Sequence, residues 1–250
     1  MIESARVKNV EMKSIRLDIV IPVHNEAATI EQTLLELCAE ITQKVPSRII
    51  IAEDGSTDGT KEILRKMSLD LPLDLILSDA RKGYMNGVKD GLRQTSCEAV
   101  FFIDSDGQYV PSDFWKLHAV VDKFDMVVGR KVRRKDSFHR IVISYIFNQM
   151  IRFLFRVPIH DVDTGFRLIR KDVIEDVLED AVVLPYSFWA EFTTRACKKG
   201  YRIGEVPIIH RNRLVGGTRL YSIKKLPKII LMQLIGLLRL FTELNITRKT

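Results

Sequence analysis

The stretch VFFIDSDGQYV, residues 100–110, is an apolar run that ends abruptly in two carboxylates. Four apolar residues precede Asp104, and Asp106 follows two positions later. Burying a carboxylate without a partner is costly, so a buried strand should end in acids only where they serve a purpose. We therefore expect the end of this strand to open onto a site that holds a cation or binds polar groups.

The same pattern recurs along the first half of the chain, where apolar runs of strand length alternate with segments of helical periodicity. The expected strands are residues 17–23, 48–55, 73–79, 98–106 and 126–129, and the expected helices between them are 26–41, 59–67 and 83–95. This alternation predicts an α/β fold with a mostly parallel central sheet flanked by helices. In such sheets, ligands bind beyond the carboxyl ends of the strands.

Acidic or polar residues gather at these strand ends, which indicates a shared site for cations or sugar hydroxyls. They are Asn25, Glu26, Glu53, Asp54, Asp79, Asp104 and Asp106. In an extended chain, Asp104, Asp106 and Gln108 lie on one side, and their oxygens suit Mg²⁺ or Mn²⁺ bound jointly with substrate phosphates. The alternative is a surface turn, in which Gly107 permits the bend.

Length, charge and cysteine content restrict the number of domains, the kinds of partner and the cellular compartment that we expect for this protein. A chain of 250 residues suits one sizeable domain, or one domain with an added segment. The charge of 39 − 32 = +7 suits an anionic substrate, an anionic membrane surface or nucleic acid. Three widely spaced cysteines and the lack of a signal peptide predict a reducing, cytoplasmic compartment.

Three motifs in the first half, IPVHNE, AEDGSTDGT and IDSDGQ, resemble in order and spacing the family 2 glycosyltransferases, which have the nucleotide-sugar-binding GT-A fold. In the second half, VGRK, HRIVISYIFN, DVDTGFRLIRK and EVPIIHRNRLVGGTR resemble the polyprenyl- or dolichyl-phosphate hexose synthases. The resemblance covers roughly residues 17–220. It implies that a hexose moves, with inversion, from a GDP- or UDP-sugar to a lipid phosphate.

The resemblance also implies roles for individual residues. Those expected to bind the nucleotide are Pro22, His24, Glu26, Ala52, Asp54, Asp79 and Ser105, with Arg130, Arg213 and Arg219 at the donor phosphates or sugar. Asp104, Asp106 and Gln108 would hold the metal, and Arg140 and Ser144 would receive the acceptor phosphate. His24 replaces the Tyr that is common in the family, and Thr218-Arg219 replaces Ser-Lys. These departures preserve phosphate binding more easily than base or sugar specificity.

Asp163 and Arg213 complete the expected catalytic set with Asp104 and Asp106. A sugar hydroxyl acceptor would need a general base, and Asp163 is the candidate for it. A lipid phosphate needs none, because its second pKa is about 6 and it is already a nucleophile at neutral pH. The alternative for Asp163 is a structural role, paired with Arg167 or placed in a turn.

Two later segments predict contact with a membrane. The basic run 129–135 precedes 138–156, which is apolar over most of its circumference when drawn as a helix. Residues 228–241 are too short to span a bilayer of about 30 Å but suit an interfacial helix. We expect an N-terminal extension over 1–16, a GT-A domain over 17–221 and an amphipathic segment over 222–250, attached peripherally to the cytoplasmic face of an anionic membrane.

Several alternatives stay open on the sequence. The apolar segments could instead meet a second copy of the chain or a membrane partner subunit. No nucleic-acid-binding motif accompanies the basic run, so no nucleic acid partner is expected. The runner-up functions are a transferase that uses a sugar hydroxyl as acceptor, and a catalytically silent module that binds nucleotide and membrane. Neither the nucleotide nor the hexose is determined.

Overall fold

The computed structural model describes residues 16–132, 138–212 and 226–246, and the side chains of 138–140, 226 and 246 are not described. Its strands are β1 (Leu17–Val23), β2 (Ser47–Glu53), β3 (Leu73–Leu77), β4 (Ala99–Ile103), β5 (Met126–Val132), β6 (Phe166–Arg170) and β7 (Ile203–Ile209). Its α-helices are α1 (Ile30–Leu37), α2 (Thr60–Met67), α3 (Tyr84–Arg93), α4 (Phe114–His118), α5 (Phe138–Phe155), α6 (Lys171–Val177), α7 (Phe188–Lys198) and α8 (Leu226–Ile246).

The strands form one sheet in the order β3-β2-β1-β4-β6-β5-β7. The pairs β1–β2, β1–β4, β2–β3 and β5–β7 are parallel, whereas β6 is antiparallel to both of its neighbours. The chain lays β2 and β3 on one side of β1 and returns to place β4 on the other. The carboxyl ends of β1 and β4 therefore flank a crevice, which is where open α/β sheets bind ligands.

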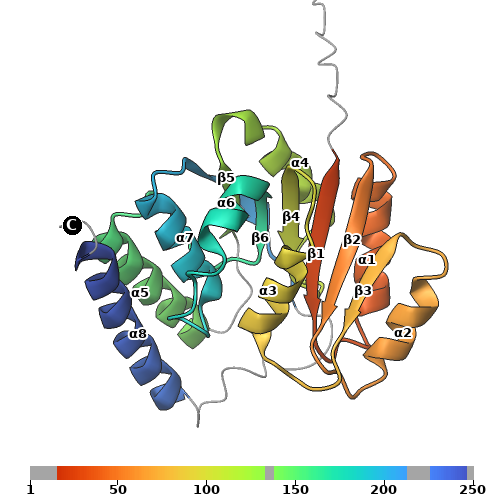
Figure 1. Ribbon diagram of the computed structural model, residues 1–250, viewed down its shortest axis with the longest axis horizontal. Helices are drawn as coiled ribbons and strands as arrows, with labels where there is room; N and C mark the ends of the chain where they lie inside the picture. The colour runs from red at the N-terminus through yellow and green to blue at the C-terminus, as the bar shows by residue number, and fades with distance from the viewer. Residues whose placement is uncertain (1–15, 133–137, 213–225, 247–250) are drawn as a thin grey trace, which may run out of the picture.

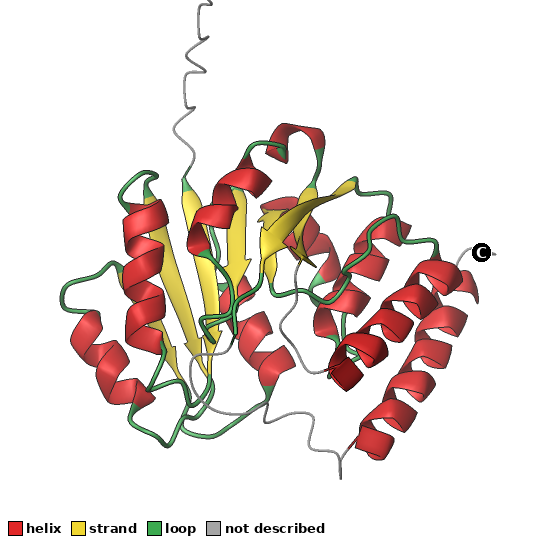
Figure 2. Cartoon of the chain, turned by 180° about the vertical axis from the view of Figure 1, so that it is seen from behind, coloured by secondary structure: helices red, strands yellow, loops and turns green. Residues whose placement is uncertain are grey.

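Two apolar layers cover the two faces of the sheet (Figures 1 and 2). On one face, Ile19 and Ile21 of β1 pack with side chains of α1, α2 and α4. On the other face, Val20 packs with α3, and the layer continues through α5, α6, α7 and α8. Alternation along β1 thus separates the two cores, as a pleated strand requires. Gly91 lets α3 approach closely, because a Cβ there would lie 2.7 Å from Val20 Cγ1.

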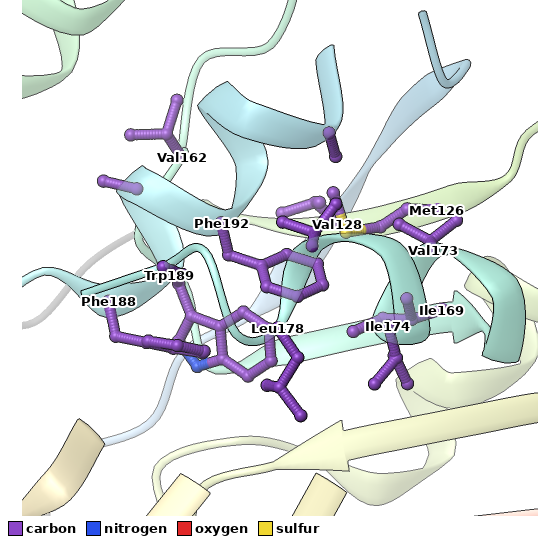
Figure 3. Close-up of a cluster of buried hydrophobic side chains, with 14 of the residues drawn as sticks. Met126, Val128, Val162, Ile169, Val173, Ile174, Leu178, Phe188, Trp189 and Phe192 are labelled. Atoms are coloured by element: carbon purple, nitrogen blue, oxygen red, sulfur yellow. The ribbon is translucent and has the colours of Figure 1, made fainter. Parts of the chain in front are cut away.

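Helix α7 forms the centre of the second layer. Figure 3 shows Phe192 of α7 lying beside Val128 of β5, with Trp189 and then Phe188 on the side away from Met126. The Trp189 ring is 1% exposed and packs edge-on against Phe102 of β4, with 4.5 Å between ring centroids. This burial fixes the first turn of α7 against the end of the sheet that carries Asp104.

The expected strands and helices of the first half are present, with shorter limits at several ends. The segment expected to be helical from residue 26 begins its helix at Ile30, and a π-helical turn over Cys38–Thr42 follows α1. Strands β6 and β7 and helix α6 were not predicted from the amino-acid sequence. Strand β6 was not predicted because Arg167 and Arg170 leave only two consecutive apolar residues in its segment, FRLIR.

Candidate active site

The described residues enclose a pocket of about 880 Å³ at the carboxyl ends of β1 and β4. Its polar end is formed by the loops after β1, β2 and β4 and by the start of α3. Its apolar end is formed by α5, α7 and α8, which lie together at one side of the molecule in Figure 1. The predicted site residues that line this pocket are Pro22, His24, Glu26, Asp54, Asp104, Ser105, Asp106, Gln108, Ser144 and Asp163.

Asp104 and Asp106 form the acidic centre of the pocket. Burial, followed by the neighbouring charge of Asp106, raises the pKa of Asp104 to about 7. Tyr84 of α3 donates a hydrogen bond to Asp104 Oδ1 at 2.8 Å, and Trp189 Nε1 donates to the Tyr84 hydroxyl at 3.1 Å. Residues of two helices therefore orient the Asp104 carboxyl group, whereas burial and the charge of Asp106 disfavour its ionised form.

Gly165 is the residue that lets Asp104 fit. A Cβ at this position would lie 1.9 Å from Asp104 Oδ2, so no side chain can be accommodated without moving the carboxylate. The Gly165 carbonyl accepts from the Asp104 backbone N–H at 3.0 Å, and the Gly165 N–H donates to the Tyr109 hydroxyl at 3.1 Å. The glycine of the DTG motif thus serves close packing against the acidic centre.

The donor set at this centre fits a hard divalent cation. Gln108 donates through its amide nitrogen to the Arg211 carbonyl at 3.2 Å, which leaves Oε1 as the ligating atom to consider. Within the described ranges, no three His, Cys, Asp or Glu side chains form a complete ligand group. Two carboxylates with an amide oxygen match the pattern of Mg²⁺ and Mn²⁺ sites in which substrate phosphates supply further ligands. A cation would also favour the ionised form of Asp104, whose pKa is raised by burial and then by the charge of Asp106.

Two of the residues expected at the nucleoside, His24 and Asp54, line the same pocket and are held by hydrogen bonds. His24 Nδ1 donates to the Asp54 carbonyl at 2.7 Å, and Asn25 Nδ2 lies 3.3 Å from His24 Nε2. The Asp54 carboxylate accepts from the backbone N–H groups of Lys82 and Gly83 at 2.5 and 2.9 Å. Asp54 thereby fixes the loop before α3.

Three expected nucleotide contacts are not brought to the pocket. Ala52 is 2% exposed inside the sheet, and neither it nor Asp79 lines the cavity. Arg130 lies with its Nε 3.8 Å from Glu205 Oε2, and the next residue, Lys131, lines the pocket instead. Successive side chains of a strand point to opposite faces. Which of Arg130 and Lys131 faces the pocket therefore depends on how β5 pairs with its neighbours.

Lys131 is one of the pocket residues that the sequence analysis missed. Its Nζ lies 3.5 Å from Asp161 Oδ2, and its side chain is 11% exposed. Arg81 and Lys82, from the ARKG segment before α3, also line the pocket. Arg81 and Lys82 could have been predicted as pocket residues, because they form a basic pair shortly after the end of an expected strand. The predicted residues Arg213 and Arg219, and the side chain of Arg140, lie outside the described part of the chain.

Asp163 holds the first turn of α7. Its Oδ1 accepts from the Ala190 backbone N–H at 3.2 Å, a capping bond made from 27 residues away. Burial raises the pKa of Asp163 to about 6, while the nearby cations Lys131 and Arg167 oppose the rise. Arg167 instead stacks on Trp189, with 4.3 Å from the guanidinium carbon to the ring centroid, and donates to Thr193 Oγ1 at 2.9 Å. Asp163 is thus a structural cap whose side chain also lines the pocket.

The sequence profile described as "Glycosyl transferase family 2" matches residues 18–178, which is more than half of the chain. The chain belongs to this family. Polyprenol monophosphomannose synthase of Mycolicibacterium smegmatis is 28% identical over 216 residues, covering 81% of this chain and 80% of that protein. Undecaprenyl-phosphate 4-deoxy-4-formamido-L-arabinose transferase of Serratia proteamaculans is 28% identical over 224 residues, covering 84% of this chain and 64% of that protein.

The fold has solved counterparts as well. Glucosyl-3-phosphoglycerate synthase from Mycobacterium tuberculosis, solved with Mn²⁺, uridine diphosphate and phosphoglyceric acid, superposes with a TM-score of 0.66 at 17% identity. The match covers 91% of this chain and 78% of that chain. The family match and this likeness confirm the predicted family and the predicted GT-A architecture.

Proposed function

We propose that this glycosyltransferase transfers a hexose from a GDP- or UDP-sugar to the phosphate of a polyprenyl phosphate, with inversion at the anomeric carbon. One observation supports this function most strongly: a single pocket joins the Asp104–Asp106 centre to an apolar end between α5 and α8. That end is lined by Ile143, Ile146, Phe147, Met150, Ile229, Ile230, Leu234 and Leu237. An apolar wall beside carboxylates that would hold a cation and, through it, phosphate groups suits an acceptor that has a charged head and a hydrocarbon tail.

The names of the two curated relatives support the same acceptor class. One is a polyprenol monophosphomannose synthase and the other an undecaprenyl-phosphate sugar transferase. The likeness to a structure solved with Mn²⁺ and uridine diphosphate supports the expected cofactor, Mg²⁺ or Mn²⁺, and a nucleotide-linked donor. GDP- and UDP-sugars remain equal candidates, and the hexose is unassigned.

In the proposed reaction, an oxygen of the acceptor phosphate attacks the anomeric carbon from the face opposite the leaving group. The new bond joins that carbon to the phosphate oxygen, and the bond to the nucleoside diphosphate breaks with its electron pair on the departing oxygen. Asp104, Asp106 and Gln108 would hold the divalent cation, which when bound supplies positive charge beside the leaving diphosphate. Lys131 and Ser144, which line the pocket, would contact phosphate oxygens.

No general base is needed for this acceptor, because a phosphate monoester is ionised at neutral pH. Asp163 then serves to orient the pocket and to accept hydrogen bonds from sugar hydroxyls. Its pKa, raised to about 6, also suits a base for a hydroxyl acceptor, and this observation keeps that reaction as the second candidate. The two candidate reactions differ in how strongly their rates should fall when the charge of the Asp163 carboxylate is removed.

A transfer assay distinguishes the candidates. Purified protein would be incubated with each of a panel of GDP- and UDP-hexoses, with Mn²⁺ or with a chelator, and with either a polyprenyl phosphate or the matching polyprenol. We expect metal-dependent transfer to the phosphate, which Asp163→Asn slows only modestly. Transfer to the alcohol alone, abolished by Asp163→Asn, would establish the hydroxyl reaction. Nucleotide binding without any release of sugar would identify a silent module.

We also propose that the outer surface of α5 and α8 rests on an anionic membrane. None of the helices in the described ranges combines the length and hydropathy needed to cross a bilayer. The outer face of α8 nonetheless exposes Leu231, Ile235 and Leu238 at 59, 58 and 68%, and Phe153 of α5 is 85% exposed. This face borders the apolar end of the pocket, so a lipid acceptor could enter from the bilayer. Co-sedimentation with anionic vesicles should exceed that with neutral vesicles, and a stable dimer that hides this face would contradict the assignment.

A further inference from the structure

Glu205 of β7 is a largely buried carboxylate that lies outside the set of described residues lining the pocket. Its side chain is 11% exposed. Burying a carboxylate is costly unless its oxygens are hydrogen-bonded. Glu205 Oε1 accepts from the backbone N–H groups of His160 and Asp161, both at 2.8 Å, and Oε2 lies 2.9 Å from His160 Nδ1. Glu205 therefore holds the turn over residues 160–161, although it follows Asp161 by 44 positions in the chain.

Arg130 of β5 is directed to the same carboxylate. Its Nε lies 3.8 Å from Glu205 Oε2. In the pairing of β5 with β7, Val128 is opposite Glu205, so Arg130 is the diagonal neighbour on the next strand and can reach the same face. The arginine expected at the donor phosphates is thus engaged with Glu205, and its charge offsets that of the carboxylate that holds the turn.

Asp161 links this turn to the pocket. Its Oδ2 accepts from the Lys131 backbone N–H at 3.4 Å and lies 3.5 Å from Lys131 Nζ. The side chains of Asp161 and Lys131 are only 8 and 11% exposed, and both residues line the pocket. Lysine carries its charge on a long flexible stem, so a buried partner restricts where the ammonium group can lie. Asp161 therefore fixes the Lys131 ammonium, which is the group that would contact phosphate oxygens.

Helix α5 anchors the same segment one residue later. Asn148 Oδ1 accepts from the Val162 backbone N–H at 2.9 Å, and Asn148 is 7% exposed. This bond does not depend on Glu205. Loss of the two backbone bonds to Glu205 should therefore release residues 160–161 locally, while the segment that leads into β6 stays in place.

We propose that Glu205 is a positioning residue, which fixes the turn over residues 160–161 so that Asp161 holds the Lys131 ammonium at the substrate phosphates. The inference rests on the proposed function, in which Lys131 contacts phosphate oxygens. Glu205 itself touches no reacting atom. Charge develops on the phosphate oxygens as the nucleoside diphosphate leaves, so a displaced ammonium should cost more in the transition state than in the bound donor. Loss of Glu205 should lower kcat and leave KM for the donor nearly unchanged.

The first test compares two variants of Glu205 in the transfer assay. Glu205→Met removes both acceptor oxygens, and kcat should fall about tenfold with KM for the donor within about twofold. Glu205→Gln should stay within about twofold of wild type in both constants, because its amide oxygen can still accept from both backbone N–H groups. Equal losses of kcat in the two variants, or an increase in KM alone, would overturn the proposal.

His160→Ala is the matched control. It removes the imidazole that meets Oε2 and keeps the two backbone bonds to Oε1. The His160 side chain is 54% exposed and does not belong to the described lining of the pocket. Both constants should stay within about twofold of wild type. A tenfold loss of kcat in this variant would show that the bonds to the turn backbone are not what matters.

A double-variant cycle with Lys131 separates positioning from a purely structural role. Lys131→Met alone should lower kcat by about 10²–10³-fold. If Glu205 acts through Lys131, adding Glu205→Met should cost no further turnover, although its effect on the melting temperature should persist. A further tenfold loss of kcat in the double variant would refute the inference. If Glu205→Met does not fold, Asp161→Asn takes its place in the cycle, because it weakens the ion pair with Lys131 while keeping the shape.

The wild-type measurement distinguishes this inference from the proposed function. If wild-type protein transfers to the polyprenyl phosphate and Glu205→Met behaves as wild type, the positioning role alone is wrong. If wild-type protein transfers only to a hydroxyl acceptor, the proposed function is wrong, and Lys131 would still serve the leaving diphosphate. The same variant series measured with that acceptor then decides the inference, with the same ranking expected.

Discussion

The two ends of the pocket are built in different ways. The polar end stands on parallel strands and their loops, and its side chains are fixed by backbone groups, as when Lys82 and Gly83 donate to Asp54. The apolar end stands on packed helices, and α8 is tied to α7 by the Gln233–Ser187 and Glu243–Arg195 contacts. Backbone-anchored groups hold a charge site rigid, whereas helix packing with few directional bonds can admit a long flexible chain. The predictions below test this division, from the largest expected effect on chemistry to the smallest.

Asp104→Asn should have the largest effect. The change removes one negative charge from the acidic centre while keeping its shape, so we expect sugar transfer to fall by about 10²–10³-fold and Mn²⁺ binding to weaken in parallel. Calorimetric titration with Mn²⁺ and a transfer assay would measure both. Asp122→Asn, at an exposed turn away from the pocket, is the control. Normal transfer by Asp104→Asn would refute the assignment of the polar end.

Gly165→Ala should be nearly as damaging. The added Cβ would lie 1.9 Å from Asp104 Oδ2, so the carboxylate must move. A displacement of about 1 Å in a reacting site costs about a hundredfold in turnover. Gly87→Ala is the matched control, since its Cβ would stand 3.7 Å from that of Asp54. Equal activity of the two variants would show that the close packing at Gly165 is irrelevant to catalysis.

Tyr84→Phe should weaken metal binding without abolishing it. It deletes the hydrogen bond of 2.8 Å to Asp104 and strands the Trp189 N–H that donates to the same hydroxyl. Removing a group that orients a metal ligand typically costs about 10- to 100-fold in affinity, and we expect the lower value for Mn²⁺. Tyr201→Phe, which removes a surface bond to Asp176, should leave that affinity unchanged.

The metal-free protein should lose stability as the pH rises. Asp104 and Asp163 have folded-state pKa values of about 7 and about 6, above the ordinary 3.8. Between about pH 4 and pH 7 the folded state therefore binds more protons than the unfolded state, and its stability falls with increasing pH. Thermal melting at pH 5, 6, 7 and 8 should show this decline, and Mn²⁺ should reverse it most at pH 8. A flat profile would contradict the raised pKa values of these two buried carboxyl groups.

Changing the outer face of α8 should have the smallest effect on chemistry. Replacing Leu231, Ile235 and Leu238 with serine removes exposed apolar surface without touching the inner face. Vesicle binding should drop by at least about tenfold, while hydrolysis of the donor sugar in the absence of acceptor should stay within about twofold. A collapse of donor hydrolysis would show that the two ends of the pocket are not separable in this way.

Much of the polar end of the pocket was predictable, because each strand and the polar residues at its end lie within a short segment of the sequence. An apolar run followed by Asp104 and Asp106 predicts both a strand and a site at its end, and the resemblance of the motifs predicts the family that the sequence profile confirms. The strand ends also predicted that Glu26 and Asp54 would lie near this centre, and both line the pocket. The roles of these residues remain predictions, to be tested by the variants above.

The tertiary structure decided what depends on partners far away in the chain. Whether Arg130 or Lys131 faces the pocket follows from the pairing of β5 with β6 and β7, which a single strand cannot reveal. The buried Glu191 carboxylate accepts from the Val183 and Leu184 N–H groups and so holds the segment before α7, a role that its position in the sequence does not reveal. The amino-acid sequence determined which groups stand at each strand end, because that choice is made within a few residues. Packing determined which of them meet, because burial and hydrogen bonding select partners across the whole chain.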